Sequence, residues 1–163
     1  MSFRILGLPA QRFTHLFSLS YNELAQRRAV RRVVDAKPGY PCRISLTDAE
    51  IGDEVILVNY EHLPVASPYR ASHAVYVRAN EATFDAIDQV PDMLRRRLLS
   101  LRGFDADGMM TDADVVDGRD LESTVERLLG NARTDYLHAH IARPGCYAAR
   151  IERAPTATQS ARG

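Results

Sequence analysis

Short β-strand patterns, separated by turn signals, run through most of this 163-residue chain. The strongest pattern covers residues 54–62 and has Val55-Ile56-Leu57-Val58 at its centre. At 42–46, apolar and polar residues alternate as they do in a half-buried strand. Further strands are expected at residues 3–8, 30–35, 74–78, 99–106, 109–116, 136–142 and 146–152. Because these strands mostly follow one another through short turns, they predict an antiparallel sheet.

Helical patterns are inserted between the strands. Phe13, Leu16 and Phe17 have the i, i+3, i+4 spacing of one helix face. Gly130 stands where a left-handed C-terminal cap would follow the last helix, and Asp107-Gly108 predicts a type I′ hairpin turn. Helices are expected at residues 10–19, 91–97 and 118–129, and residues 21–29 could form another.

The predicted fold class is therefore α+β, with a mainly antiparallel sheet and two or three inserted helices. A chain of this length fits one globular domain, which we expect over residues 1–154. Residues 155–163 are rich in Ala, Thr, Ser and Gln, and we expect them to form a flexible C-terminal tail.

The charge balance argues against some partners. The chain has 21 basic and 21 acidic residues, whereas proteins that bind nucleic acid usually carry a basic excess. No segment approaches the roughly 20 apolar residues of a membrane-spanning helix. The charge is also uneven, since residues 1–43 hold eight basic and two acidic side chains, and residues 103–126 hold eight acidic ones and Arg119. Two such faces could meet in a homodimer.

Cysteine usage indicates a reducing compartment. Cys42 and Cys146 are too few and too far apart for a disulfide scaffold. The N-terminal residues lack the apolar run and cleavage pattern of a secretion signal. We therefore expect a cytoplasmic protein.

His138-Ala139-His140 is the first candidate for chemistry. On a strand, residues two apart point to the same face, so the two imidazoles would project side by side. His62, at the end of the strongest strand, could supply a third nitrogen, and three histidines can form an open zinc site. The same side chains could instead hold an anion. A tight turn after this strand would place His140 across from Ala149.

Residues around two neighbouring loops add further candidates. Tyr60 shares a strand face with His62, and Arg70 could bind a carboxylate or phosphate with two hydrogen bonds. Glu61 could be the ion-pair partner of Arg70 or a general base. Arg143 comes three residues after His140 in the sequence. The candidate ligand-binding residues are Tyr60, His62, Arg70, His138, His140 and Arg143, with His62, His138 and His140 as the possible metal ligands.

Four segments, at residues 37–43, 59–72, 105–118 and 136–147, resemble a known bacterial family. The most specific pieces are Pro68-Tyr69-Arg70-Ala71-Ser72 and Ala142-Arg143-Pro144-Gly145-Cys146-Tyr147. The family is the one named "domain of unknown function" 1203. The resemblance covers nearly the whole chain and implies a small bacterial cytoplasmic protein that stands alone as one domain. It supplies no activity, cofactor or catalytic residue.

Three hypotheses about function remain open at this point. The first is binding or conversion of a small anionic metabolite in a pocket of His and Arg side chains. The second is a metal-dependent enzyme that uses the three histidines. The third is a non-catalytic protein that forms a homodimer. The chain has no glycine-rich phosphate loop, no G-x-S-x-G elbow and no H-E-x-x-H motif, so neither a cofactor nor a reaction is indicated.

Overall fold

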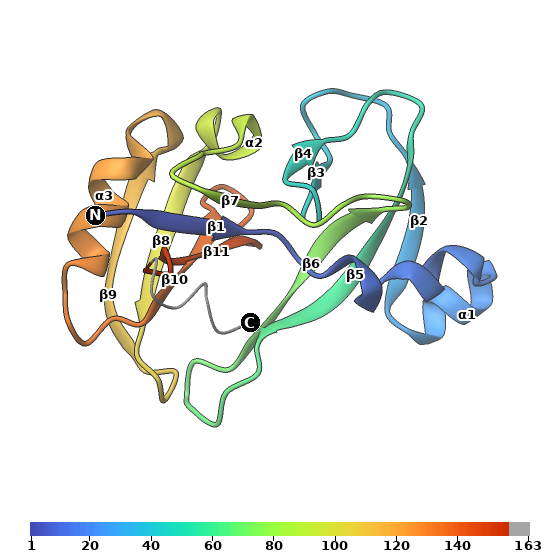
Figure 1. Ribbon diagram of the computed structural model, residues 1–163. Helices are drawn as coiled ribbons and strands as arrows, with labels where there is room; N and C mark the ends of the chain where they lie inside the picture. The colour runs from blue at the N-terminus through green and yellow to red at the C-terminus, as the bar shows by residue number, and fades with distance from the viewer. Residues whose placement is uncertain (157–163) are drawn as a thin grey trace.

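The structure, a computed structural model, describes residues 1–156 and contains two β-sheets (Figure 1). The larger sheet has six strands in the order β7-β1-β11-β10-β8-β9, and every neighbouring pair is antiparallel. Its strands are β1 (Phe3–Leu6), β7 (Asp85–Ile87), β8 (Leu98–Phe104), β9 (Met110–Asp117), β10 (Tyr136–Ile141) and β11 (Tyr147–Arg153).

The smaller sheet has five strands in the order β2-β5-β6-β3-β4. Its pairs are antiparallel except for the bridge between Cys42 and Tyr76, which is parallel. These findings confirm the α+β class with mainly antiparallel sheet. The strands are β2 (Ala29–Val33), β3 (Pro41–Cys42), β4 (Thr47–Asp48), β5 (Glu54–Leu63) and β6 (Ala71–Arg78).

The helices are short. α1 (Tyr21–Gln26) begins at a capping box, in which the Ser20 hydroxyl accepts from the Glu23 N–H and the Glu23 carboxylate accepts from the Ser20 N–H. The remaining helices are α2 (Asp92–Arg95), α3 (Leu121–Leu129) and the 3₁₀ turns Ala10–Arg12, Thr14–Ser18 and Gly118–Asp120.

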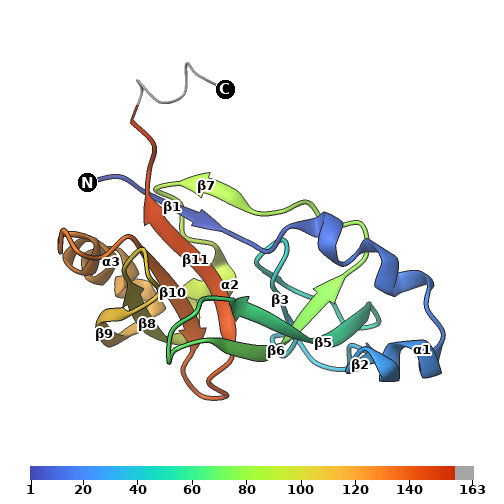
Figure 2. The ribbon, with the colours of Figure 1, turned by 90° about the horizontal axis from the view of Figure 1, so that it is seen from below.

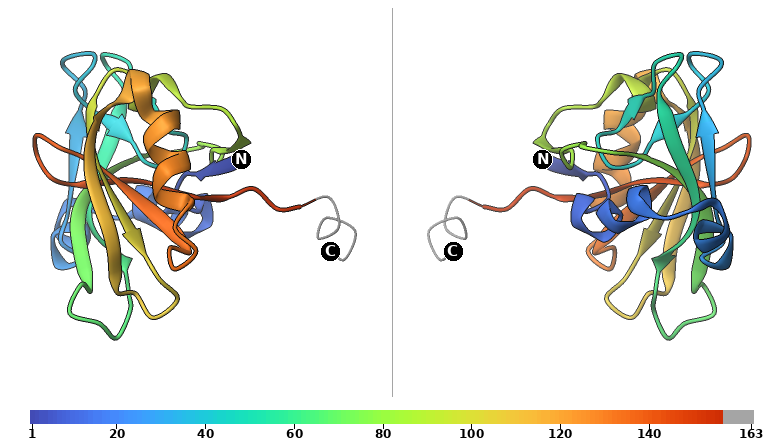
Figure 3. Two further views of the ribbon diagram at one scale, coloured as in Figure 1. Left: turned by 90° about the vertical axis from the view of Figure 1, so that its left-hand side faces the viewer. Right: turned by 90° about the vertical axis from the view of Figure 1, so that its right-hand side faces the viewer.

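Helix α3 covers one face of the six-stranded sheet, as Figure 3 shows. Its apolar stripe (Leu121, Val125, Leu128 and Leu129) is buried against apolar residues of β8, β10 and β11. On β10 these are Leu137, Ala139 and Ile141. Because side chains alternate along a strand, the other face of β10 carries His138 and His140.

The five-stranded sheet has its own core. Phe13, Leu16 and Leu24, from the N-terminal turns and α1, pack against Ile56, Val58, Val75 and Val77 of β5 and β6. This sheet approaches the uncovered face of the six-stranded sheet, so that the ends of β5 and β6 pass beside β10 and β11 (Figure 2).

Two sequence predictions of whole elements were wrong. Residues 10–19 form two 3₁₀ turns rather than one helix, with the buried Phe13 between them. The strand expected at 42–46 ends at Cys42, and Leu46 adopts a φ of +52°. The Arg43 side chain, which this alternation placed among the polar positions, is buried and donates to the backbone carbonyl of Tyr147.

Two predicted turn conformations were also wrong. Gly130 keeps a right-handed φ of −65° because its N–H still bonds the Glu126 carbonyl, as in one more helical turn. In the β8–β9 hairpin only Gly108 has a positive φ, of +76°, whereas a type I′ turn needs two such residues. The Asp105 carboxylate accepts from two backbone N–H groups of this loop and holds a longer connection instead.

Most of the expected C-terminal tail, residues 157–163, lies outside the described residues. Within residues 1–156, none of the helices has the length and apolar character needed to cross a membrane.

Candidate functional site

Four of the chain's five histidines meet where β5 and β6 pass beside β10. His62 comes from β5, His73 from β6, and His138 and His140 from β10. The alternation predicted for β10 is confirmed, because His138 and His140 both face His62. The ring centre of His62 lies 5.2 Å from that of His138 and 5.1 Å from that of His140.

A β-bulge places His62. The pairing of β5 with β6 is regular as far as Tyr60 and His73, and its register then shifts before Leu63. His62 lies in this irregular stretch. Since a bulge bends its strand and redirects the side chains beside it, the end of β5 can present His62 to the neighbouring sheet.

A second bulge changes the surroundings of His140. The register of β10 with β11 shifts beside this residue, and His140 pairs with Tyr147 rather than with Ala149 as a regular tight hairpin would require. The buried Tyr147 ring therefore takes the place of the alanine expected opposite His140. That ring stacks on His62, with 4.7 Å between centres and 11° between planes.

Hydrogen-bond distances link His62 to His138 and to His73, and His140 bonds to the backbone. His62 Nδ1 lies 3.1 Å from His138 Nδ1, and His62 Nε2 lies 2.7 Å from His73 Nδ1. The Gly145 carbonyl accepts from His140 Nδ1 at 3.0 Å. This bond fixes the tautomer of His140 and leaves a lone pair on Nε2. That nitrogen is buried and has no hydrogen-bond partner among the described residues.

The spacing of the nitrogens fits a shared metal ion. His62, His138 and His140 each offer one nitrogen, and these three atoms lie within 4.8 Å of one another. Nitrogens at 2.0–2.1 Å from one zinc ion are about 3–3.5 Å apart, which matches the His62–His138 pair. The other separations among the three nitrogens are no longer than 4.8 Å.

The cluster is uncharged near neutral pH. Burial lowers the pKa of His138 to about 2, and the neighbouring His62 adds to this effect. Burial likewise lowers the pKa of His62 to about 3 and the pKa of His140 to about 4. Neutral imidazole is the form that binds metal, so burial holds all three rings in the ligating state.

A cavity of about 510 Å³ gives access to the cluster from one side. Tyr60, His62, His138 and Tyr147 line it, together with Arg150. The Arg150 guanidinium lies 4.0 Å from the centre of the Tyr136 ring. The cavity is large enough for a small molecule, and its wall contains the Arg150 guanidinium, whose Nε donates to Glu152 Oε2 at 3.0 Å.

The structure brings four of the six predicted ligand-binding residues together: Tyr60, His62, His138 and His140. Arg70 is exposed and makes two hydrogen bonds of 3.1 and 3.2 Å to Glu61, so Glu61 is its ion-pair partner. Arg143 lines a different cavity.

The sequence analysis missed His73, Tyr147 and Arg150. His73 had a detectable signal, because the β5–β6 hairpin places it opposite Tyr60, a residue already singled out. The positions of Tyr147 and Arg150 relative to the histidines depend on the register of β10 with β11. The bulge changes this register, and no residue pattern in the sequence marks the bulge.

Neither the curated proteins nor the solved structures include a significant match. A family model, described as "Protein of unknown function (DUF1203)", matches residues 39–153. This segment contains all four clustered histidines and most of both sheets. Since it is well over half of the chain, the protein belongs to the DUF1203 family.

Proposed function

We propose that His62, His138 and His140 bind one Zn²⁺ ion and that the protein uses it to act on a small anionic molecule. The observation that carries this proposal is the fully buried His140, whose Nε2 has no hydrogen-bond partner among residues 1–156. An unsatisfied buried acceptor costs about 1–3 kcal/mol. A metal ion would use that lone pair.

The groups around the three histidines support the same assignment. Metal-ligating histidines usually donate their other ring N–H to a backbone carbonyl or another acceptor. His140 has such a bond to Gly145, and His62 is hydrogen-bonded through its second nitrogen to His73. In both rings, the nitrogen that would not bind the metal is held by a hydrogen bond, which fixes the orientation of the ring.

The cavity beside the cluster supports a role beyond structure. A zinc ion held by the three histidines would keep a position for water, and it would supply a nucleophile by lowering the pKa of that water. Tyr60 and Arg150 line the cavity next to His62 and His138. Arg150 is paired with Glu152 through Nε, and its two Nη groups would be the ones to contact an anionic substrate there.

We also place this protein in the bacterial cytoplasm. The family resemblance favours a bacterial source, and Cys42 and Cys146 are both free thiols, which fits a reducing compartment.

The test of the metal proposal is metal binding by protein purified without an affinity tag. Chelator-treated wild type is incubated with Zn²⁺, dialysed, and analysed for metal by mass spectrometry. We expect about one ion per chain in the wild type and almost none in His140→Ala. The matched control is His15→Ala, because His15 is exposed, lies on the Thr14–Ser18 turn and is outside the cluster. Equal metal content in wild type and His140→Ala would overturn the proposal.

A further inference from the structure

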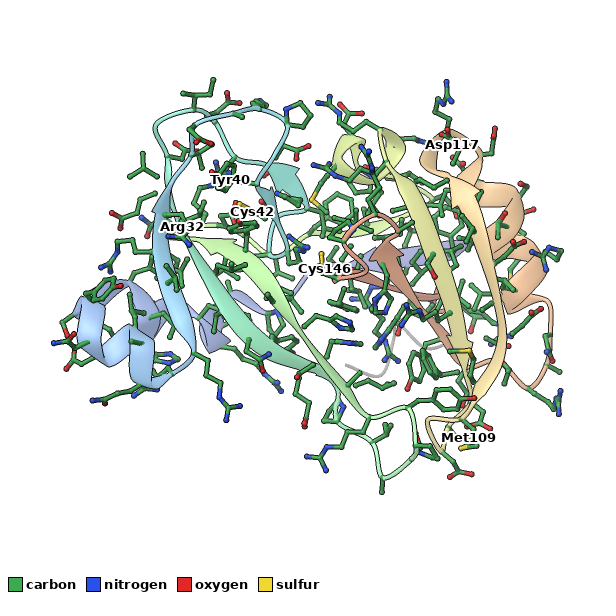
Figure 4. All side chains as sticks on the ribbon, turned by 180° about the vertical axis from the view of Figure 1, so that it is seen from behind. Arg32, Tyr40, Cys42, Met109, Asp117 and Cys146 are labelled. Carbon is green, nitrogen blue, oxygen red and sulfur yellow. The ribbon has the colours of Figure 1, made fainter. Side chains whose placement is uncertain are left out.

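A second cavity, of about 770 Å³, lies next to the histidine cluster, between β6 and the turn that joins β10 to β11. Cys146 forms part of its wall and lies between the two sheets in Figure 4. None of the residues that line it is Asp or Glu, and four are arginines: Arg43, Arg96, Arg97 and Arg143. The cavity is in the size range of small-molecule sites.

Arg43 is the unusual member of this group, because its side chain is only 1% exposed and has no carboxylate partner among the described residues. It donates from Nε to the Tyr147 carbonyl at 2.9 Å, from Nη1 to the Pro41 carbonyl, and from Nη2 to Cys146 Sγ at 2.9 Å. These acceptors orient the guanidinium, and none of them is a carboxylate. A buried charge without a counter-ion is expensive, so an anion in the cavity would stabilise it.

The other three arginines differ in whether a carboxylate of the protein already pairs with them. Arg97 forms an ion pair with Asp48, with 3.0 Å between Nη1 and Oδ2. The side chains of Arg96 and Arg143 are exposed and make no hydrogen bond or ion pair with residues 1–156. Within the described part of the chain, three guanidinium groups therefore line one cavity without a carboxylate at ion-pair distance.

The rest of the lining is mostly apolar, with Pro41, Leu57, Leu98, Ile141 and Pro144 in the wall. An apolar wall beside unbalanced arginines suits an organic anion better than a bare inorganic ion. A phosphate monoester carries close to two negative charges at pH 7 and three acceptor oxygens, which match the forked donors of arginine.

We propose that this cavity binds a small organic phosphate, with its dianionic head toward Arg43, Arg96 and Arg143 and its apolar part against Leu57 and Ile141. The site shares no residue with the proposed metal ligands. His73, which lines this cavity and contacts His62, is the residue between the two sites.

The experiment is a calorimetric titration of chelator-treated protein with 1-naphthyl phosphate at pH 8 and low salt. Because the metal has been removed, the outcome does not depend on the metal proposal. We expect Arg143→Gln and Arg96→Gln each to weaken binding about tenfold and the double variant to abolish it. The control is Arg133→Gln, since Arg133 is exposed in the loop before β10, at the opposite end of that strand from Arg143.

Two further ligands test the chemical class. Inorganic phosphate should bind more weakly than the ester, because it has no apolar part, and 1-naphthyl sulfate more weakly because it carries one charge. The proposal is overturned if the wild type does not bind 1-naphthyl phosphate, or if Arg143→Gln binds it as tightly as Arg133→Gln. Equal affinity for the sulfate would overturn the assignment to a phosphate.

Discussion

The buried histidines make the metal-free protein sensitive to acid. The pKa of His138 is about 2 in the folded protein, against an ordinary value near 6.5. The unfolded chain takes up protons at this histidine below pH 6.5, while the folded chain does not. Its contribution to stability is therefore complete above pH 6.5 and is lost as the pH falls toward 2, by up to about 1.4 kcal/mol per pH unit.

We expect the free energy of unfolding of chelator-treated protein, measured in urea, to fall between pH 7.5 and pH 5. His138→Gln should lessen this fall, because glutamine does not titrate. His15→Gln is the control and should leave the fall unchanged. If His138→Gln and wild type lose the same free energy over this range, the folded His138 is protonated as readily as the unfolded one.

Single residues also show where the sequence was informative. His138 and His140 could be placed on one face because strand alternation is a local rule that two residues suffice to apply. The partnership of His140 with the Gly145 carbonyl, and of Arg43 with the Tyr147 carbonyl, could not be predicted. Each of these bonds joins segments whose relative placement is set by the tertiary fold or by the conformation of a turn. A local residue pattern does not encode that placement.

At the scale of elements, the entry to α3 depends on a close approach to α2. Gly118 opens the 3₁₀ turn before α3, and a Cβ built there would lie 1.8 Å from the Leu94 carbonyl oxygen. We expect Gly118→Ala to lower the free energy of unfolding by about 3 kcal/mol, because the backbone must shift to make room. Urea unfolding at pH 7.5 measures this.

Gly130 provides the matched control at the other end of the same helix. Its φ of −65° suits alanine, and its nearest contact would be 3.1 Å, to the Glu126 carbonyl oxygen. Gly130→Ala should change stability by less than about 1 kcal/mol. Equal effects of the two substitutions would show that the contact with Leu94 is not the determinant.

The elements that the sequence predicted well are those whose signal is local and repeated. The apolar run of β5 and the stripe of α3 are examples, since one face of each is buried along its length. The predictions of a helix at residues 10–19 and of a strand at residues 42–46 were wrong because tertiary contacts determine the backbone conformation there. Phe13 packs into the core between two short turns, and the Arg43 side chain turns inward after β3.

At the scale of the whole molecule, the proposed metal would join the two sheets. His62 belongs to the five-stranded sheet, and His138 and His140 to the six-stranded one. A ligand at a hundred times its dissociation constant stabilises the folded state by about 2.7 kcal/mol. We therefore expect Zn²⁺ to slow amide exchange near the end of β5 and along β10 together, by up to about a hundredfold.

Hydrogen-exchange mass spectrometry with and without Zn²⁺ measures this effect. His15→Ala should behave like the wild type, and His140→Ala should show no protection. Protection confined to one sheet would mean that the ion does not bridge them.

The charge asymmetry noted in the sequence is partly balanced within the chain. Asp117 pairs with Arg119, and Asp112 and Asp114 both pair with Arg127 of α3. The acidic segment is therefore less available to a second copy than the residue count suggested. The homodimer stays a prediction.

The pairing of the first strand with the last has a mechanical consequence. Phe3 lies opposite Arg153, and Leu6 opposite Arg150, so the chain enters β1 and leaves β11 at the same end of their ladder. Pulling the two ends apart would strain these hydrogen bonds one after another, as in a zipper, rather than all at once in shear. The β1–β11 ladder is therefore the place where tension on the ends would begin to open the protein.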